Sequence, residues 1–505
     1  MMSRAVLWRG LKRNFSAVPA SRTLPSIQNG GDGTDSKFIQ ARGPYDGQSS
    51  LVLREVGSTR TVFLLRPNLY SKEIEAIGHQ IKLLSESAGI ASVLVVSGTV
   101  AEGLAGLPLT VLETQHHNSE VVDVDIRSRG SEAGLAVGGY DPLEVFKTNE
   151  HTDPVAIQTL LDSLSLLADA TRGSPKSTRI PVITVPHGLI TDGGYSFCMG
   201  SYVLATPDTS FRILNPSRGL SFDPVGLSFF LPRLGWEFQQ ASARYTGCGL
   251  LLALSGIEAN AVDMLETGLA THFIESPSSS IGAIEQSLSQ LVPWNQQRLV
   301  KDKVRLHGQA QLREDANAAF RNVAVANHLY AFTSHHITGD DMLPDAHGDV
   351  PTDADPTTDL DGFDWYEEVD SRLLNYAATF DMIFTEETSV AGIIARFKEM
   401  AAAGANGEQE SEVSKVAEDL ALRMECQSPL ALSVVYRLMQ EGARNGATLD
   451  ACIEREKRAQ AKLFGMEDFM AWGSSSESKA MGKCPPWKHK SVDEVSEDEI
   501  TEVVG

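Results

Sequence analysis

Apolar residues in the first part of the chain form short runs and one helical stripe. Residues 51–53 and 61–65 are predicted to be strands, joined by a turn at Gly57 and Ser58. Residues 93–96, Val-Leu-Val-Val, predict a further buried strand. Between them, apolar residues at spacings of three, four and three predict one face of an amphipathic helix: Ile74, Ile77, Ile81 and Leu84.

The same alternation continues after a long interruption. Apolar spacing predicts a helix over 155–170, and residues 181–185 predict a strand that runs into His187 and Gly188. Helices alternating with buried strands predict an α/β core with parallel strands. Residues 99–131 are too long for a usual connection and are predicted to be an insertion.

Helical periodicity dominates the second half of the chain. A chain of 505 residues exceeds what one core usually supports, so we expect a core over 49–295 and a helical C-terminal domain over 296–490. Residues 340–364 are strongly acidic and predict a solvated insertion, and residues 491–505 predict an acidic tail. Helices are predicted over 411–426, 430–442 and 449–464, the second after the capping pair Ser428 and Pro429.

The N-terminal residues have the composition of a mitochondrial presequence. Residues 1–31 carry five basic residues, several serines and no acidic residue. We expect a presequence over 1–15, a flexible leader over 16–48 and a location in the mitochondrial matrix. The alternative interpretation is a disordered basic tail.

The net charge, the apolar runs and the cysteine spacing argue against a nucleic-acid-binding surface, a membrane span and a metal site. The formal net charge of -23 disfavours broad contact with nucleic-acid backbones. No apolar run of 18 residues is present, so no membrane span is expected. The cysteines lack metal-ligand spacing, so we expect no metal site and read them as reduced thiols: Cys198, Cys248, Cys426, Cys452 and Cys484.

Two glycine clusters are candidate elements of a site. Residues 136–139 read Ala-Val-Gly-Gly, and residues 187–194 contain His187 and end in Gly193-Gly194. Glycine allows close approach of the backbone to a ligand, and two converging N–H groups form an oxyanion hole. Neither cluster is a nucleotide-binding motif, and a tight turn is the alternative for each.

These clusters resemble elements of the crotonase superfamily, in particular of the 3-hydroxyisobutyryl-CoA hydrolases. Residues 181–194 are similar to the strand, His-Gly and glycine triplet of that family, and 136–139 to its Ala-Gly-Gly element. Later landmarks are 230–234, 254–256 and 268–273. The resemblance implies a crotonase-type ββα core with a helical C-terminal extension, no cofactor, and a coenzyme A thioester as possible ligand. It also implies an oxyanion hole from Val137, Gly138, Gly193 and Gly194.

The sequence departs from that family where catalysis takes place. The family has a Pro-Glu pair followed eight residues later by an aspartate, but here the glutamate position is Pro216 or Ser217. Neither residue is a carboxylate base. Asp223 is the acid available to replace the family aspartate, with a shift of one residue. In place of the family's glycine triplet this chain has Asp192-Gly193-Gly194, and the Asp192 carboxylate would disfavour an oxyanion if it faced inward.

Further residues around the presumed pocket also differ from the family. Tyr195 places a bulky ring where an acyl group would approach, and Asp162 is the nearest acid to the family's helix glutamate. His187 is interpreted as a packed structural histidine. The pairs at 116–117 and 335–336 are interpreted as solvated histidines.

Two functions from different classes are consistent with these residues. The first is a pseudo-enzyme with an eroded site, a structural component of a mitochondrial assembly; the resemblance points to the small ribosomal subunit, with protein partners and little direct RNA contact. The alternative is an active 3-hydroxyisobutyryl-CoA hydrolase of valine catabolism in which Asp223 is the base.

Overall fold

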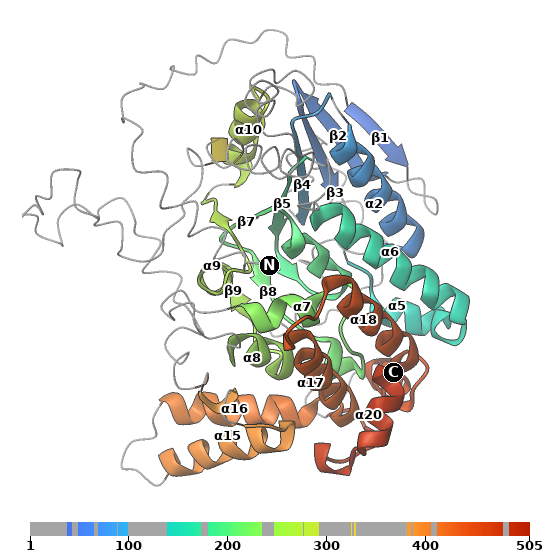
Figure 1. The fold of residues 1–505 in the computed structure, drawn as a ribbon, viewed down its shortest axis with the longest axis vertical. Coiled ribbons are helices and arrows are strands. Elements are labelled where there is room, and N and C mark those ends of the chain that lie inside the picture. The colour runs from blue at the N-terminus through green and yellow to red at the C-terminus, as the bar shows by residue number, and fades with distance from the viewer. Residues whose placement is uncertain are drawn as a thin grey trace, which may run out of the picture.

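The fold is known from a computed structural model that describes most of the regular elements (Figure 1). The described residues are 38–42, 49–64, 69–87, 89–98, 139–172, 180–234, 247–275, 277–291, 387–405, 412–477 and 484–505, with a few positions at 325, 328–329, 380 and 382–384.

The centre of the fold is a seven-stranded sheet of order β1-β2-β3-β4-β5-β7-β10. The strands from β3 to β10 pair in parallel, whereas β1, β2 and β3 pair antiparallel. A smaller sheet has the order β6-β8-β9. The bounds are β1 Phe38–Arg42, β2 Ser49–Val56, β3 Thr59–Leu64, β4 Ser92–Gly98, β5 Val182–His187, β6 Leu189–Ile190, β7 Tyr202–Ala205, β8 Ser210–Phe211, β9 Ala259–Asn260 and β10 His272–Phe273.

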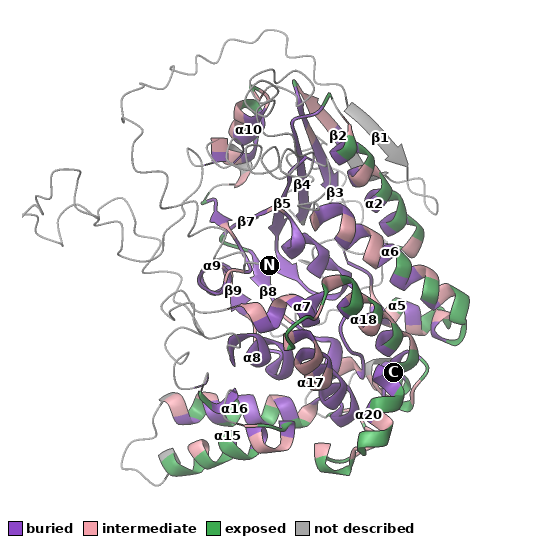
Figure 2. Ribbon diagram, viewed as in Figure 1, coloured by how far each residue is buried: buried purple, intermediate pink, exposed green. Residues whose placement is uncertain are grey.

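Helices cover both faces of the large sheet because the strands carry apolar residues on both sides. Val62 and Val95 face the cluster that contains the apolar stripes of α2 (Ser71–Glu86) and α6 (Pro154–Arg172). Phe63 and Val96 point to the other face, where α10 (Pro277–Leu288) packs. This period of two is the expected pattern for parallel strands buried on both sides. Figure 2 shows the buried strands between these helices, whose outer faces are exposed.

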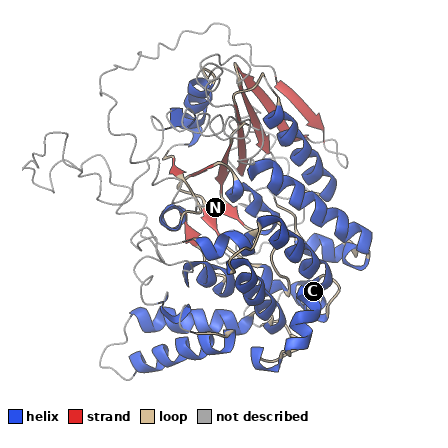
Figure 3. Ribbon diagram, in the orientation of Figure 1, coloured by secondary structure: helices blue, strands red, loops and turns tan. Residues whose placement is uncertain are grey.

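The C-terminal helices pack onto the core, and in Figure 3 they form the lower part of the molecule. One continuous apolar cluster runs from Leu53 in β2 to Val504 in α20. The remaining helices are α5 Pro142–Lys147, α7 Leu227–Phe230, α8 Gly247–Ser255, α9 Ala261–Thr267, α15 Val390–Ala405, α16 Glu412–Cys426, α17 Pro429–Ala443, α18 Leu449–Leu463, α19 Glu467–Glu477 and α20 Glu497–Val504.

The elements expected from the apolar pattern are present. The predicted strands correspond to β2, β3, β4 and β5, and the predicted helices to α2, α6, α16, α17 and α18. Ser428 is the N-cap of α17, where its side chain accepts a hydrogen bond from the Ala431 amide, and Pro429 takes the first helical position. Within the described residues no helix is long and apolar enough to cross a membrane.

Parts of the expected leader and of the expected acidic tail form regular structure. Residues 38–42 of the expected leader form β1, because their backbone pairs antiparallel with β2. Residues 497–504 of the expected tail form α20, which buries Ile500, Val503 and Val504 against the C-terminal helices. The presequence 1–15, the insertion 99–131 and the acidic insertion 340–364 lie outside the described residues.

The prediction that all cysteines are reduced was wrong for one pair. Cys426 and Cys484 form a disulfide across a sequence separation of 58 residues, with their Cα atoms 5.0 Å apart. Cys198, Cys248 and Cys452 are buried thiols outside the disulfide, in line with the expectation of reduced cysteines. The disulfide could not be predicted from the spacing of Cys426 and Cys484, because the two sulfurs meet only where the chain after residue 484 packs against the end of α16.

Candidate functional site

The two glycine clusters meet in the fold. A Cβ atom added at Gly139 would lie 3.0 Å from the Asp192 carbonyl oxygen and 3.1 Å from the Gly194 nitrogen. Position 139 therefore favours glycine, because a Cβ atom would press on the backbone of the second cluster and force it to shift. Val137 and Gly138 lie outside the described residues, so their expected part in an oxyanion hole stays a prediction.

The second cluster forms a tight 3-10 turn after β6. The Gly194 N–H donates to the Thr191 carbonyl at 3.1 Å, so that this donor is used within the turn. At Gly193, an added Cβ atom would lie 2.4 Å from the Leu164 side chain in α6. Packing and turn geometry thus account for both glycines in this structure.

Asp192 occupies a backbone conformation that favours glycine, and it is paired with a cation. Its φ is 39°, and its buried carboxylate accepts a hydrogen bond from the half-buried Arg218 guanidinium. Burial raises the pKa of Asp192, and the charge of Arg218 opposes that rise. Burial by itself lowers the pKa of Arg218, but Asp192 outweighs it and raises that pKa, so Arg218 stays protonated. The Asp192 carboxylate is directed at Arg218, which neutralises it.

Tyr195 is part of the packed interior. Its ring is fully buried, and its hydroxyl donates to Asn215 Oδ1 at 2.8 Å and lies 3.1 Å from the Arg212 carbonyl oxygen. Burial and the charge of Asp192 raise the pKa of Tyr195, so the hydroxyl remains a neutral donor. The aromatic ring therefore fills space beside the glycine turn.

Asp223 is the carboxylate at the centre of this region. It is fully buried, and its Oδ1 accepts hydrogen bonds from the Tyr140 hydroxyl at 3.0 Å and from Gln460 Nε2 at 3.2 Å. Its Oδ2 has no hydrogen-bond partner among the described residues. Burial, helped by the charge of Asp192, raises the pKa of Asp223 to about 7. The Asn215 amide lies nearby and lowers the pKa of Asp223, although its nitrogen makes no well-formed hydrogen bond to Asp223 Oδ2.

The two residues predicted to stand at the family's glutamate position bond to the backbone of the fold. Pro216 is buried in a 3-10 helix over Asn215–Arg218, and its carbonyl oxygen accepts the Ser428 N–H at 3.1 Å. The Ser217 hydroxyl donates to the Leu214 carbonyl at 2.7 Å. Neither residue can act as a carboxylate base.

Helix α18 contributes two buried polar residues that the sequence analysis missed. Gln460 also accepts hydrogen bonds through Oε1 from the Ser221 N–H at 2.8 Å and the Ser221 hydroxyl at 3.1 Å. One turn earlier, Glu456 accepts from the Gly226 N–H, the Ser228 N–H and the Ser228 hydroxyl, each at 2.7 Å. Together they hold residues 221–228, here named the Asp223 loop. The available signal was a pair of polar residues four positions apart on the apolar face of a predicted helix.

Other candidate residues lie away from this cluster. His187 is buried, lies 2.8 Å from the Thr206 hydroxyl, and has its pKa lowered by burial, which confirms a packed histidine. Asp162 is on the outer face of α6 and pairs with Lys457 at 2.7 Å. The described residues contain no group of three or more potential metal ligands. The histidine pairs at 116–117 and 335–336 lie outside them.

Comparison with solved structures supports the assignment of the fold. A carnitinyl-CoA dehydratase from Mycobacterium thermoresistibile superimposes with a TM-score of 0.56 at 14% identity, covering 90% of this chain and 96% of that chain. An enoyl-CoA hydratase from Rhodobacter sphaeroides has a TM-score of 0.53 at 14% identity, covering 90% and 97%. Both are similar in fold, and the fold is of the crotonase type.

Curated relatives are more similar in sequence but match over shorter stretches. A probable 3-hydroxyisobutyryl-CoA hydrolase from Arabidopsis thaliana is 34% identical over 119 residues, which are 23% of this chain and 28% of that protein. The mitochondrial 3-hydroxyisobutyryl-CoA hydrolase of Bos taurus is 24% identical over 275 residues, which are 53% of this chain and 65% of that protein. The chain thus spans less than two thirds of the length of these relatives.

The family model for enoyl-CoA hydratase/isomerase matches residues 112–338 and 346–504, well over half of the chain. This match includes the glycine clusters, the Asp223 loop and the C-terminal helices that hold it. The chain therefore belongs to the enoyl-CoA hydratase/isomerase family, and its relatives place it in the 3-hydroxyisobutyryl-CoA hydrolase-like branch of the crotonase superfamily.

Proposed function

We propose that this protein is a 3-hydroxyisobutyryl-CoA hydrolase-like pseudo-enzyme that serves as a structural component of a mitochondrial assembly, with the small ribosomal subunit as the leading candidate. The observation that carries the proposal is at the family's glutamate position. Pro216 and Ser217 lack a carboxylate, and both bond to the backbone around them. Loss of a general base typically lowers a rate by about two to four powers of ten.

The surroundings of that position support the same proposal. The Gly194 N–H is used within its own turn, and the Asp192–Arg218 pair and the Tyr195 ring fill the space around it. An oxyanion hole needs donors aimed at the developing charge. In this structure the Gly194 donor bonds to the Thr191 carbonyl instead.

A mitochondrial location and protein partners complete the proposal. The relatives from Bos taurus and Homo sapiens carry the word mitochondrial in their names. A body with a formal charge of -23 is attracted to basic proteins and repelled by phosphate backbones. We therefore expect contacts with basic protein subunits and little direct contact with RNA.

The second candidate function is an active acyl-CoA thioester hydrolase, favoured by one observation. The pKa of Asp223 is raised to about 7, which suits a general base, and its Oδ2 accepts no hydrogen bond from the described residues. In this alternative Asp223 takes the proton of the attacking water.

Assay of the purified chain with 3-hydroxyisobutyryl-CoA separates the two functions. We expect a rate at least about two powers of ten below that of a family member that retains its glutamate. A rate equal to that enzyme, lost in Asp223→Asn, would instead establish the hydrolase. In parallel, sedimentation of a mitochondrial lysate should find the protein with the small ribosomal subunit, and sedimentation at its own mass would contradict the structural role.

A further inference from the structure

The two cysteines of the disulfide are accessible to solvent, whereas the other three cysteines are buried. Cys484 is exposed and Cys426 is half-buried at the end of α16, whereas Cys198, Cys248 and Cys452 are buried. Exposed disulfides are the ones that exchange readily with thiols, and buried thiols are protected from reagents. The structure thus separates one accessible pair from three shielded thiols.

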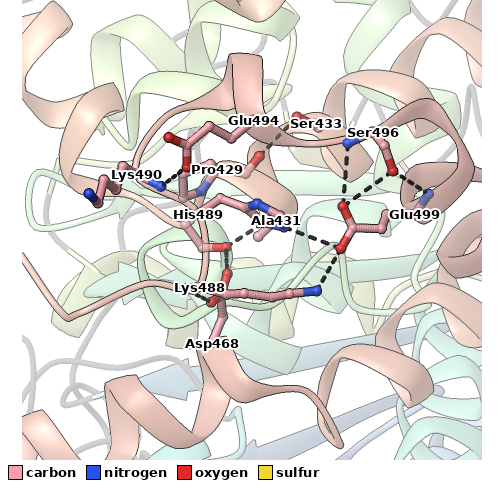
Figure 4. A network of polar contacts seen from close by, with 11 residues as sticks. Pro429, Ala431, Ser433, Asp468, Lys488, His489, Lys490, Glu494, Ser496 and Glu499 are labelled. Atoms are coloured by element: carbon pink, nitrogen blue, oxygen red, sulfur yellow. Dashed lines mark hydrogen bonds and ion pairs between the residues drawn. The ribbon is translucent and has the colours of Figure 1, made fainter.

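The bond attaches residues 484–505, here named the C-terminal segment, to the helical extension. Beside the bond, Trp487 Nε1 donates to the Cys426 carbonyl at 3.0 Å, and the Lys488 N–H donates to Asp468 Oδ1 at 2.8 Å. The other Asp468 oxygen accepts the Ser428 hydroxyl at the start of α17. Figure 4 shows Asp468 between the C-terminal segment and α17, with Lys488 reaching Glu499.

Noncovalent contacts hold the same segment at its far end. Inside the segment, Lys488 Nζ lies 2.6 Å from Glu499 and ties its two ends together, and this hydrogen bond is the main cause that lowers the pKa of Glu499 to about 2. Glu497 pairs with Arg437 of α17, and α20 buries its apolar residues against α17 and α18. These contacts with α17 and α18 do not involve the disulfide, so the bond adds to a noncovalent attachment.

We propose that Cys426 and Cys484 form a reversible redox site, at which a dithiol reductant opens the disulfide and loosens the C-terminal segment without unfolding the chain. The disulfide closes a loop and so restricts the conformations that the C-terminal segment can adopt when it is not docked. Reduction removes this restriction and raises the population of undocked conformations. The proposal concerns this segment alone and holds whether the Asp223 region is catalytic or not.

The chemistry is an ordinary two-step exchange. A thiolate of the reductant attacks the exposed Cys484 sulfur, the bond between the two cysteines breaks, and Cys426 leaves as a thiolate that takes a proton from solvent. The second thiol of the reductant then attacks the mixed disulfide and releases Cys484. Two electrons pass to the protein pair, and the dithiol becomes a disulfide. Glutathione disulfide reverses the outcome by its own route: one cysteine thiolate attacks it, forming a mixed disulfide with glutathione and releasing one glutathione, and the second cysteine then displaces the other.

The first test counts reactive thiols on the full-length folded protein. The protein is equilibrated with glutathione disulfide or with dithiothreitol, alkylated without denaturant, and analysed by peptide mass spectrometry. We expect Cys426 and Cys484 to be alkylated only after dithiothreitol, and the buried cysteines to stay unmodified in both. Alkylation of Cys426 and Cys484 after glutathione disulfide would overturn the proposal, and so would a pair that dithiothreitol leaves closed.

The second test measures hydrogen exchange in α20 for the two redox states. We expect exchange of the amides in 497–504 to become at least about tenfold faster on reduction, because the loop-closure constraint is removed. Cys484→Ser should match the reduced wild type and not respond to dithiothreitol, while the matched control Cys248→Ala should respond as the wild type does. Equal exchange rates in the two states of the wild type would show that the bond does not control the segment.

Discussion

Two buried carboxylates with the same pKa have very different surroundings. Glu456 and Asp223 are both fully buried, and burial raises the pKa of each to about 7. Glu456 accepts three short hydrogen bonds, two of them from backbone N–H groups, on both of its oxygens. Asp223 accepts two longer bonds from side chains, both on Oδ1.

The difference shows that a raised pKa does not by itself identify a functional group. The donors of Glu456 come from the backbone that it supports, so its role is to hold the Asp223 loop against α18. Asp223 retains one oxygen without a hydrogen-bond partner in the described residues, which is the feature a base or ligand contact requires. The kind of donor therefore separates a structural carboxylate from a candidate site.

The largest expected effect is on Glu456. Glu456→Ala leaves two backbone N–H groups and the Ser228 hydroxyl without their acceptor, and we expect a loss of about 4 kcal/mol in the free energy of unfolding. Urea denaturation measures the loss. Glu454→Ala on the exposed side of the same helix is the control and should change stability by less than about 0.5 kcal/mol. Similar losses for both variants would contradict the structural role of Glu456.

Asp192 is expected to have the next largest effect. Asp192→Asn tolerates the positive φ but removes the charge that compensates the half-buried Arg218, and we expect a loss of about 3 kcal/mol in the free energy of unfolding. The matched control is Asp208→Asn, whose exposed carboxylate lies 3.3 Å from His187. Thermal unfolding compares the two variants, and Asp208→Asn should change stability little, because its carboxylate is exposed and burial lowers the pKa of the neighbouring His187. An unchanged stability of Asp192→Asn would mean that Arg218 finds another partner.

The pH dependence of stability distinguishes Asp223 from its neighbours. Because the folded pKa of Asp223 is about 7 and lies above the usual value, its contribution to stability is complete below pH 4 and is lost as pH rises toward 7. Asp223→Asn should therefore reduce the fall in the free energy of unfolding between pH 5 and pH 8 by about 2 kcal/mol. Denaturation at both pH values measures it, and an unchanged slope would place the Asp223 pKa near its ordinary value.

The smallest expected effect is on Gln460. Gln460→Met keeps the volume but removes one donor to Asp223 and the acceptor for Ser221, so we expect a loss of about 1 to 2 kcal/mol. Without that donor the pKa of Asp223 should rise further, so the loss should be greater at pH 8 than at pH 5. An equal loss at both pH values would mean that Gln460 only packs against the Asp223 loop.

The sequence predicted the elements whose signals are local. β3 and β4 follow from runs of apolar residues, and α17 begins at Ser428 and Pro429 because a side-chain cap and a proline suit that position. The absence of a carboxylate at Pro216 and Ser217 could also be read directly, since it depends only on which side chains are present. These features need no knowledge of distant partners.

The contacts that define the site depend on distant partners. Gln460 is 237 residues from Asp223 in sequence, and no local pattern connects them. Arg218 was not identified as the partner of Asp192, because the two are separated by 26 residues and meet only when the 3-10 turns pack together. The disulfide was missed for the same reason. Propensity and spacing describe elements, whereas these contacts follow from how the elements pack.

The hydrogen bonds from the Asp223 loop to α18 join residues that are synthesised at very different times. Gly226 and Glu456 are 230 residues apart, and chains grow at about 5–20 residues per second, so roughly 12 to 46 s separate the two ends of this contact. During that interval the carboxylate of Glu456, which accepts hydrogen bonds from the Gly226 and Ser228 N–H groups in the folded protein, has not yet been synthesised. The Asp223 loop can therefore reach its final conformation only after α18 has been synthesised.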